Sequence, residues 1–211
     1  MKAEKMCKNE VRLVGTISSN VVLDHETKHG KMYKFMISVS RTSGVIDELP
    51  VIITEKMFES EIDNLEVGKL CTILGEYRSY SFDHHVRLLV LAKQIYNYDD
   101  DKINNEAAFV GYIAKSNQTR TTPKGKKIKD IIVAVNHSFG RTAYIPCVVW
   151  NDERYDKKAT EVGSRVSVVG RIQSREYTKR YGDDTVENKI AYEVSISNIK
   201  LDEEKEEEAV I

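Results

Sequence analysis

The stretch NEVRLVGTI at residues 9–17 decides the fold, because the similar stretch NEAAFVGYI follows it 96 positions later at residues 105–113. Three further segments recur in the same order at nearly the same offset. Residues 35–40 correspond to 131–136 and residues 49–53 to 145–149 at offset 96, and residues 66–68 with Gly75 correspond to 161–163 with Gly170 at offset 95. Four ordered matches indicate that the chain contains two copies of one domain.

Within each copy, hydrophobic residues alternate with polar or smaller ones, which is the period of a β-strand. Val11, Leu13 and Ile17 follow this pattern in the first copy. A helical stretch is expected between the third and fourth strands of each copy, over Glu55–Leu65 and Asp152–Thr160. Five strands with one helix in this position predict an all-β protein of two tandem OB-folds, which are five-stranded Greek-key barrels.

The 211 residues suffice for two domains of about 100 residues each. The first OB-fold is predicted over residues 1–98 and the second over residues 105–201. Residues 99–104 are acidic and polar, and we interpret them as the linker. Residues 202–211 form an acidic C-terminal tail with an apolar end.

The formal net charge of −1 hides a strong segregation of charge along the chain. Residues 1–101 carry 13 Lys and Arg against 16 Asp and Glu, a net of −3. Residues 102–201 carry 18 against 11, a net of +7, and residues 202–211 carry one against six, a net of −5. A positively charged second domain indicates a polyanionic partner.

Other classes of protein find little support in the sequence. The longest apolar run, Leu88–Ala92, is far shorter than the roughly 18 residues of a membrane span, and no secretion signal is expected at the start. The scattered Cys7, Cys71 and Cys147 favour reduced thiols in the cytoplasm. No common catalytic or metal-binding motif occurs, so we expect neither an enzyme nor a metal or other cofactor.

The second copy resembles the bacterial single-stranded DNA-binding protein family in three motifs that follow in order. They are VAVNHSF at residues 133–139, YIPCVVW at residues 144–150, and the strand and Arg-aromatic hairpin of residues 162–177. His137 stands where the family usually has arginine. The first copy is similar more loosely, with Thr54 where the second has Trp150.

This resemblance implies a non-catalytic module that coats single-stranded DNA without sequence preference, in replication, recombination or repair. Members of the family commonly assemble four OB-folds, which implies a homodimer for a chain with two. The tail at residues 202–211 is similar in charge to the family's segment that recruits partner proteins, which implies replication or repair proteins as partners. It lacks the usual Pro-Phe end.

Binding a single strand without reading its sequence requires cations along the phosphates and exposed rings on which bases stack. The second copy supplies both, in the loop at residues 120–129 and in the hairpin around residues 171–181. The expected cationic contacts are Arg120, Lys124, Lys126, Lys127, Arg141, Arg171, Arg175, Lys179 and Arg180, with Arg41 from the first copy. The expected stacking residues are Phe139, Tyr144, Trp150, Tyr177 and Tyr181, with Tyr80 and Phe82 from the first copy.

Alternatives remain open from the sequence alone. Trp150, at the end of an apolar run, fits a core position as well as a stacking position, and the Tyr80 and Phe82 hairpin fits a dimer interface as well as DNA. We therefore hypothesise that the second copy binds DNA, while the first contributes to assembly and binds DNA weakly. A protein-interaction scaffold with weak nucleic-acid binding is the alternative function, and RNA is an alternative ligand.

Overall fold

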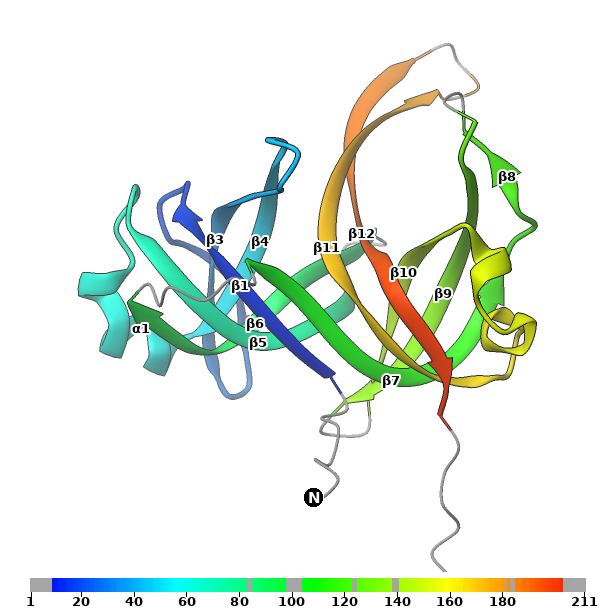
Figure 1. The fold of residues 1–211 in the computed structure, drawn as a ribbon. Helices are drawn as coiled ribbons and strands as arrows, with labels where there is room; N and C mark the ends of the chain where they lie inside the picture. Colours follow the sequence, from blue (N-terminus) through cyan, green and yellow to red (C-terminus); the bar gives the residue numbers. More distant parts are fainter. Residues whose placement is uncertain are drawn as a thin grey trace, which may run out of the picture.

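The protein consists of two β-barrels that lie side by side (Figure 1). This computed structural model describes residues 9–82, 85–97, 104–122, 125–137, 141–180, 182 and 185–202, with the side chains of 81, 82 and 85 outside the description. The first barrel contains β1 (Asn9–Ile17), β2 (Val22–Thr27), β3 (Gly30–Ser40), β4 (Ile46–Thr54), β5 (Leu70–Phe82) and β6 (His85–Asn97). The second contains β7 (Asn105–Ser116), β8 (Arg120–Thr121), β9 (Lys127–His137), β10 (Arg141–Trp150), β11 (Arg165–Arg180) and β12 (Val186–Leu201).

Both barrels close through the same order of strands. In the first, β1 pairs with β3 and β5, β3 with β4, β4 with β6 in parallel, and β6 with β5. In the second, β7, β9, β10, β12 and β11 repeat this circuit, with β10 and β12 parallel. The short strands β2 and β8 extend β3 and β9 at the edge. The prediction of two tandem OB-folds is confirmed, and its exact domain boundaries stay a prediction because 98–103 lie outside the described residues.

The alternating hydrophobic residues fill the barrel interiors, as the period of two predicts. Leu13, Phe35 and Ile73 are buried in the first barrel, and Phe109 and Val133 in the second. Burial of large apolar side chains of this kind is the main favourable term in folding.

The glycine shared by both copies marks the place where two strands cross closely. A Cβ at Gly75 would lie 2.3 Å from the carbonyl oxygen of Leu91, and one at Gly170 would lie 2.5 Å from that of Ser195. Both glycines adjoin a register shift in their strand pair. A side chain at either position would therefore push the paired strands apart.

The helical segment differs between the copies. In the first, α1 (Glu55–Glu61) begins where the Thr54 hydroxyl accepts a hydrogen bond from the Met57 backbone nitrogen, and a 3-10 turn, η1 (Ile62–Asn64), follows. In the second, the prediction of one helix over Asp152–Thr160 is wrong. Two 3-10 turns, η2 (Asp152–Arg154) and η3 (Lys157–Thr160), replace it.

The break in the second copy falls at Tyr155, which contacts a strand that is distant in sequence. Tyr155 is extended and its hydroxyl donates to the Ser197 carbonyl oxygen at 2.9 Å, which ties this residue to β12. Asp156 then accepts from the Lys158 nitrogen and starts the second turn. None of the helices among the described residues is long and apolar enough to cross a membrane.

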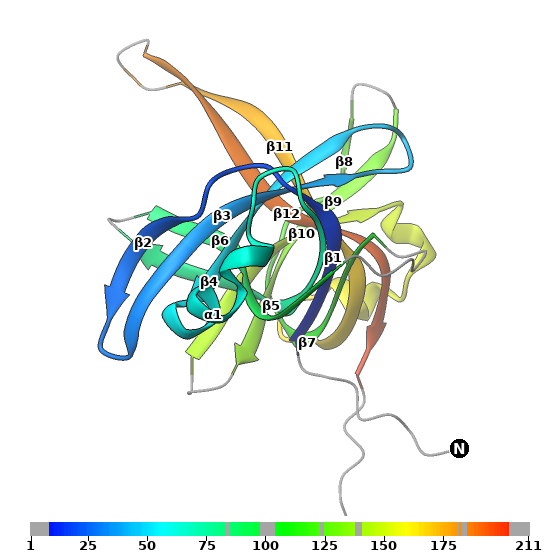
Figure 2. The ribbon, with the colours of Figure 1, turned by 90° about the vertical axis from the view of Figure 1, so that its left-hand side faces the viewer.

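Strands β1 and β7 join the two barrels by antiparallel pairing (Figure 2). Val11 lies opposite Ala107, which is its own counterpart at offset 96. An approximate twofold axis therefore passes through this pair. Asn9 and Asn105, also counterparts, each donate to and accept from one backbone position on a neighbouring strand, at Tyr77 and Ile172 respectively.

Polar contacts fix the barrels to each other beyond this strand pair. The buried Asp47 carboxylate accepts two hydrogen bonds from Arg41 at 2.6 Å, and from the backbone nitrogen and hydroxyl of Ser174 at 2.7 and 3.2 Å. On the other side of the junction, the Tyr144 nitrogen donates to the Ser79 hydroxyl at 2.7 Å. Each barrel thus uses its long hairpin to hold the other.

Candidate nucleic-acid interface

A groove of about 980 Å³ crosses the face of the second barrel and reaches the junction with the first. We call it the Trp150 groove. It brings together five cations and one ring, namely Arg41, Lys126, Arg154, Arg171, Arg175 and Trp150. Five of these six were predicted as site residues from the sequence. They come from four separate parts of the chain, so the fold brings them together.

Trp150 lies half-buried in the wall of this groove, at the end of β10. Its indole nitrogen donates to the Ser195 hydroxyl on β12 at 3.0 Å, which fixes the orientation of the ring. The Lys126 ammonium lies 5.8 Å from the ring centroid. The indole therefore has one anchored edge and a cation beside it, an arrangement suited to a stacked base next to a phosphate.

Arg171 and Arg41 add positive charge to the lining of this groove. The Arg171 guanidinium donates to the Gln173 side-chain oxygen at 3.2 Å. Partial burial lowers the pKa of Arg171, and the charge of Arg41 lowers it further against a smaller opposite effect of Asp47. The Asp47 hydrogen bonds raise the pKa of Arg41. Positive charge is thus poorly compensated at Arg171, where an anionic ligand would stabilise it.

Arg175 and Tyr177 continue this face along β11. The Arg175 side chain pairs with Glu193 at 3.6 Å, and its guanidinium carbon lies 5.8 Å from the Tyr177 ring centroid. The Tyr177 side chain is exposed. The β11–β12 hairpin that carries both residues rises from the barrel on the same side as the arm formed by β8 and β9 (Figure 1).

Tyr144, Arg141 and Tyr80 line a different groove, of about 630 Å³, between the two barrels. Tyr144 is 54% exposed. Tyr80 belongs to β5, and its hydroxyl donates to the Asp24 carboxylate at 3.1 Å. These three predicted residues therefore lie at the junction and not with Trp150.

The remaining predicted cations lie on projecting arms. Arg120 pairs with Asp130 at 2.8 Å and Lys127 with Glu153 at 2.5 Å, and both are well exposed. Lys179 and Arg180 end the described part of β11. Phe139, Lys124 and Tyr181 lie outside the described residues, as does the side chain of Phe82.

Two residues that contact Trp150 in this groove were missed by the sequence analysis. Arg154 donates to the Trp150 carbonyl oxygen at 3.3 Å from the turn that follows β10. Ser195 supplies the acceptor for the indole. Arg154 could have been found, because it lies four residues after Trp150 in a positively charged domain. Nothing in the sequence singles out Ser195 among the serines of the last strand.

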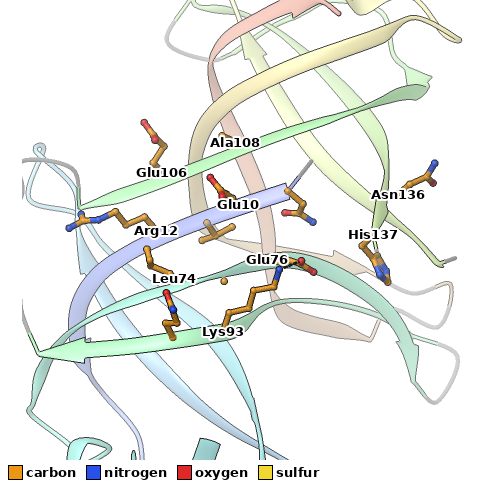
Figure 3. Close-up of a pocket in the computed structure, with 13 residues that line it drawn as sticks. Glu10, Arg12, Leu74, Glu76, Lys93, Glu106, Ala108, Asn136 and His137 are labelled. Carbon is orange, nitrogen blue, oxygen red and sulfur yellow. Dashed lines mark ion pairs between the residues drawn. The ribbon is translucent and has the colours of Figure 1, made fainter. Parts of the chain in front are cut away.

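The twofold arrangement creates a counterpart groove of about 830 Å³ (Figure 3). It contains Glu76 where the Trp150 groove has Arg171, and His137 where that groove has Arg41. Glu76 pairs with Lys93 and Arg78. Burial raises the pKa of Glu76, but these hydrogen bonds lower it more, so it lies below its ordinary value. No aromatic ring occurs among the described residues that line this groove apart from His137.

Comparison with known proteins finds one family over the second barrel. A family model described as the single-strand binding protein family matches residues 104–202. Single-stranded DNA-binding protein B of Bacillus subtilis is 33% identical over 89 residues, covering 37% of this chain and 75% of that protein. The single-stranded DNA-binding protein of Halalkalibacterium halodurans is 34% identical over 89 residues, covering 37% of this chain and 51% of that protein. The chain spans about half to three quarters of the length of these curated relatives.

Solved structures extend the likeness to both barrels. The wild-type single-stranded DNA binding protein from Thermus aquaticus matches with a TM-score of 0.69 and 20% identity, covering 92% of this chain and 93% of that one. A deletion mutant of the same protein matches with a TM-score of 0.68 and 19% identity, covering 94% and 96%. At this identity the likeness supports the two-barrel fold.

Proposed function

Because the chain belongs to the single-strand binding protein family, we propose that it binds single-stranded DNA without sequence preference, in replication, recombination or repair. The second barrel supplies the main binding surface, and no catalytic step is involved. The Trp150 groove is the site. Its combination of one anchored indole with five cations is the observation that carries the proposal.

The comparison between the two counterpart grooves supports the assignment to the second barrel. Both grooves have the same position relative to the twofold axis, yet Arg171 and Arg41 in one are replaced by Glu76 and His137 in the other. A phosphate backbone gains from the two arginines of the first set, whereas the second set offers a histidine and a carboxylate that Lys93 and Arg78 already bind. The net charge of +7 for residues 102–201, against −3 for residues 1–101, also favours binding of phosphates on the second barrel.

The groove offers a ring for stacking and cations for phosphates, and neither contact depends on the identity of the base. A base stacked on the Trp150 ring contributes about 1–3 kcal/mol whichever base it is. Each phosphate contact from Arg171, Arg175 or Lys126 adds about 0.7 to the salt dependence of binding. Duplex DNA hides its bases inside the stack, so it cannot use the indole and is bound more weakly.

A titration of fluorescein-labelled oligo-dT and of an oligonucleotide duplex at two salt concentrations tests this function. We expect tight binding of the single strand, weakened by salt, and clearly weaker binding of the duplex. Equal binding of both would overturn the proposal, and absence of binding would favour the protein-interaction scaffold. Labelled oligo-rU in the same assay decides whether RNA is bound equally well.

We further propose that the chain forms a homodimer, which would bring four OB-folds together as the family relationship suggests. Light scattering tests this by a mass of twice the 24.1 kDa of one chain. The acidic tail is proposed to recruit replication or repair proteins, although residues 203–211 lie outside the described residues. A DNA-binding role in a bacterial cell would place the protein in the cytoplasm.

A further inference from the structure

We propose that Gln173 and Glu193 are positioning residues, which hold the guanidinium of Arg171 ready for a phosphate without cancelling its charge. This inference rests on the proposed function. All three residues belong to the β11–β12 strand pair of the second barrel. Arg171 and Gln173 line the Trp150 groove, and Glu193 lies directly opposite Gln173 on β12.

The three side chains are connected by two hydrogen bonds in series. A Glu193 carboxylate oxygen accepts from the Gln173 side-chain nitrogen at 2.8 Å, and the Gln173 side-chain oxygen accepts from the Arg171 guanidinium at 3.2 Å. Gln173 and Glu193 are only 7% and 9% exposed, so water competes little for the contact between them. Arg171, at the other end of the series, is exposed and can meet a ligand.

The chemistry of the two outer groups fixes the orientation of the amide between them. An ionised carboxylate only accepts hydrogen bonds, and a guanidinium only donates them. The Gln173 amide therefore satisfies both neighbours in one orientation, with its nitrogen toward Glu193 and its oxygen toward Arg171. The reverse orientation would set two acceptors against each other at Glu193 and two donors against each other at Arg171. The carboxylate thus fixes the amide, and the amide fixes the guanidinium.

The neutral amide also keeps the carboxylate one step away from the arginine. A carboxylate in direct contact with Arg171 would compete with a phosphate for the same donors. None of the carboxylates that the structure describes forms an ion pair with Arg171. Glu193 is paired instead with Arg175, at 3.6 Å. The series therefore orders Arg171 and leaves its charge for the ligand.

The first barrel brings the same two positions into contact with a different result. At offset 95 the counterpart of Arg171 is Glu76. The counterpart of Gln173 is Arg78, and its guanidinium donates to the Glu76 carboxylate at 2.9 Å in a direct ion pair. Leu89, which has no charge, lies opposite Arg78 on β6. The contact is thus a property of the fold, whereas the amide between arginine and carboxylate belongs to the second barrel.

The test moves the carboxylate from position 193 to position 173. Glu193→Gln is the reference variant, because it removes the carboxylate but keeps an acceptor for the Gln173 amide. The double variant Gln173→Glu with Glu193→Gln keeps the wild-type net charge and puts the carboxylate in contact with Arg171. Glu193→Ala has the same charge as the reference but lacks the acceptor. Glu161→Gln is the matched control, because Glu161 is an exposed carboxylate of the second barrel that does not line the Trp150 groove.

Fluorescence anisotropy of labelled oligo-dT at several salt concentrations measures the affinities and the salt slopes. Relative to Glu193→Gln, the double variant should bind about tenfold more weakly, with a salt slope lower by about 0.7, because one phosphate contact is lost. Glu193→Ala should bind about three- to tenfold more weakly than Glu193→Gln, since the amide is no longer oriented. Glu161→Gln should bind as the wild-type protein does.

Both differences should shrink to about twofold or less when Arg171 is alanine, which a purely structural role of Glu193 would not produce. Equal affinities and slopes of the double variant and Glu193→Gln would overturn the proposal, as would differences that persist in full in the Arg171→Ala background. If the double variant failed to fold, equal affinities of Glu193→Ala and Glu193→Gln would overturn it alone. Failure of the wild-type protein to bind oligo-dT would instead overturn the proposed function.

Discussion

Individual side chains in the Trp150 groove differ in how far their charge is already compensated. The Arg41 guanidinium donates to the Asp47 carboxylate. The Arg171 guanidinium donates to the neutral side chain of Gln173 and lies near the charge of Arg41. A phosphate would therefore gain more from Arg171 than from Arg41. The sequence placed both residues in the site but could not rank them, because their partners come from distant strands.

Replacing Arg171 with alanine should weaken oligo-dT binding about tenfold, since a charge-assisted hydrogen bond to phosphate is lost. The slope of affinity against salt should fall by about 0.7, the contribution of one phosphate on a single strand. Fluorescence anisotropy at several salt concentrations measures both. Lys200→Ala is the control, because Lys200 is an exposed cation of β12 that lines none of the grooves. An unchanged slope in Arg171→Ala would remove this residue from the phosphate path.

The lowered pKa of Asp24 predicts that this residue contributes to the free energy of unfolding and that acid removes the contribution. Burial raises its pKa, but hydrogen bonds from His25 and Tyr80 and the charge of Lys34 lower it more, so the folded pKa lies below the ordinary 3.8. The unfolded chain then binds the proton more tightly than the folded one. The contribution is complete above pH 3.8 and is lost as the pH falls through the folded pKa.

Urea denaturation at neutral pH and at about pH 3 measures this contribution, because linkage ties the change in unfolding free energy to proton uptake. The wild-type protein should lose more unfolding free energy on acidification than Asp24→Asn, which cannot titrate at this position. An equal loss in both proteins would show that Asp24 does not contribute.

At the scale of elements, the long hairpin β11–β12 depends on one carboxylate of the other barrel. Asp47 is buried and receives hydrogen bonds from Arg41 and Ser174. Its counterpart in the second barrel, at offset 96, is Ala143, so this contact exists on one side of the junction only. The hairpin that carries Arg171, Arg175 and Tyr177 is thus held by a carboxylate, whereas the β5–β6 hairpin is held through Ser79 by the Tyr144 nitrogen.

Asp47→Ala should lower the free energy of unfolding by about 2–3 kcal/mol, because it leaves a partly buried guanidinium and a backbone donor without their partner. Chemical denaturation measures the change. Asp63→Ala, at an exposed aspartate of η1, should change stability by less than about 0.5 kcal/mol. A result for Asp47→Ala as small as that of the control would contradict the role assigned to this contact.

The crossing of β11 and β12 gives a second prediction at this scale. Gly170→Ala should destabilise the protein by about 1–3 kcal/mol, since the added methyl group meets the Ser195 carbonyl oxygen. It should also weaken oligo-dT binding, because Ser195 holds the Trp150 indole. Gly182→Ala, where none of the residues that the structure describes lies within 4 Å, is the matched control. Equal melting temperatures of the two variants would argue against the close approach.

The strands were predictable because hydrophobic residues alternate with polar or smaller ones in the sequences of β1, β3 and their counterparts. This alternation becomes the alternation of buried and exposed side chains. The sequence predicts one helix over residues 152–160, and the two 3-10 turns found there were not predictable. The hydrogen bond from Tyr155 to β12 overrides the local preference for helix. The β1–β7 pairing was also beyond sequence reasoning. An edge strand that pairs with another barrel carries the same alternation as one that meets solvent.

Across the whole molecule, an approximate twofold axis relates two barrels that carry different charges. The sequence predicted the segregation of charge and five of the six cations and rings in the Trp150 groove, including Arg41 of the first copy. It did not predict that Tyr80 and Tyr144 would lie apart from them in another groove. Those placements depend on the angle between the barrels, which the β1–β7 pairing sets.

The division of work between the barrels is best tested in the full chain. Separating them would expose β1 and β7, whose backbone groups now pair with each other. Unpaired edge strands promote association between chains and would obscure any difference in DNA affinity. Variants of the two counterpart grooves avoid this difficulty.

The most direct test of the central claim is the emission of Trp150, the single tryptophan, during a titration of the wild-type protein with unlabelled oligo-dT. We predict saturable quenching, with a midpoint that matches that of labelled oligo-dT binding and moves to higher concentration as salt is added. Tight binding of the oligonucleotide with unchanged emission of Trp150 would contradict the claim that the strand lies in the Trp150 groove.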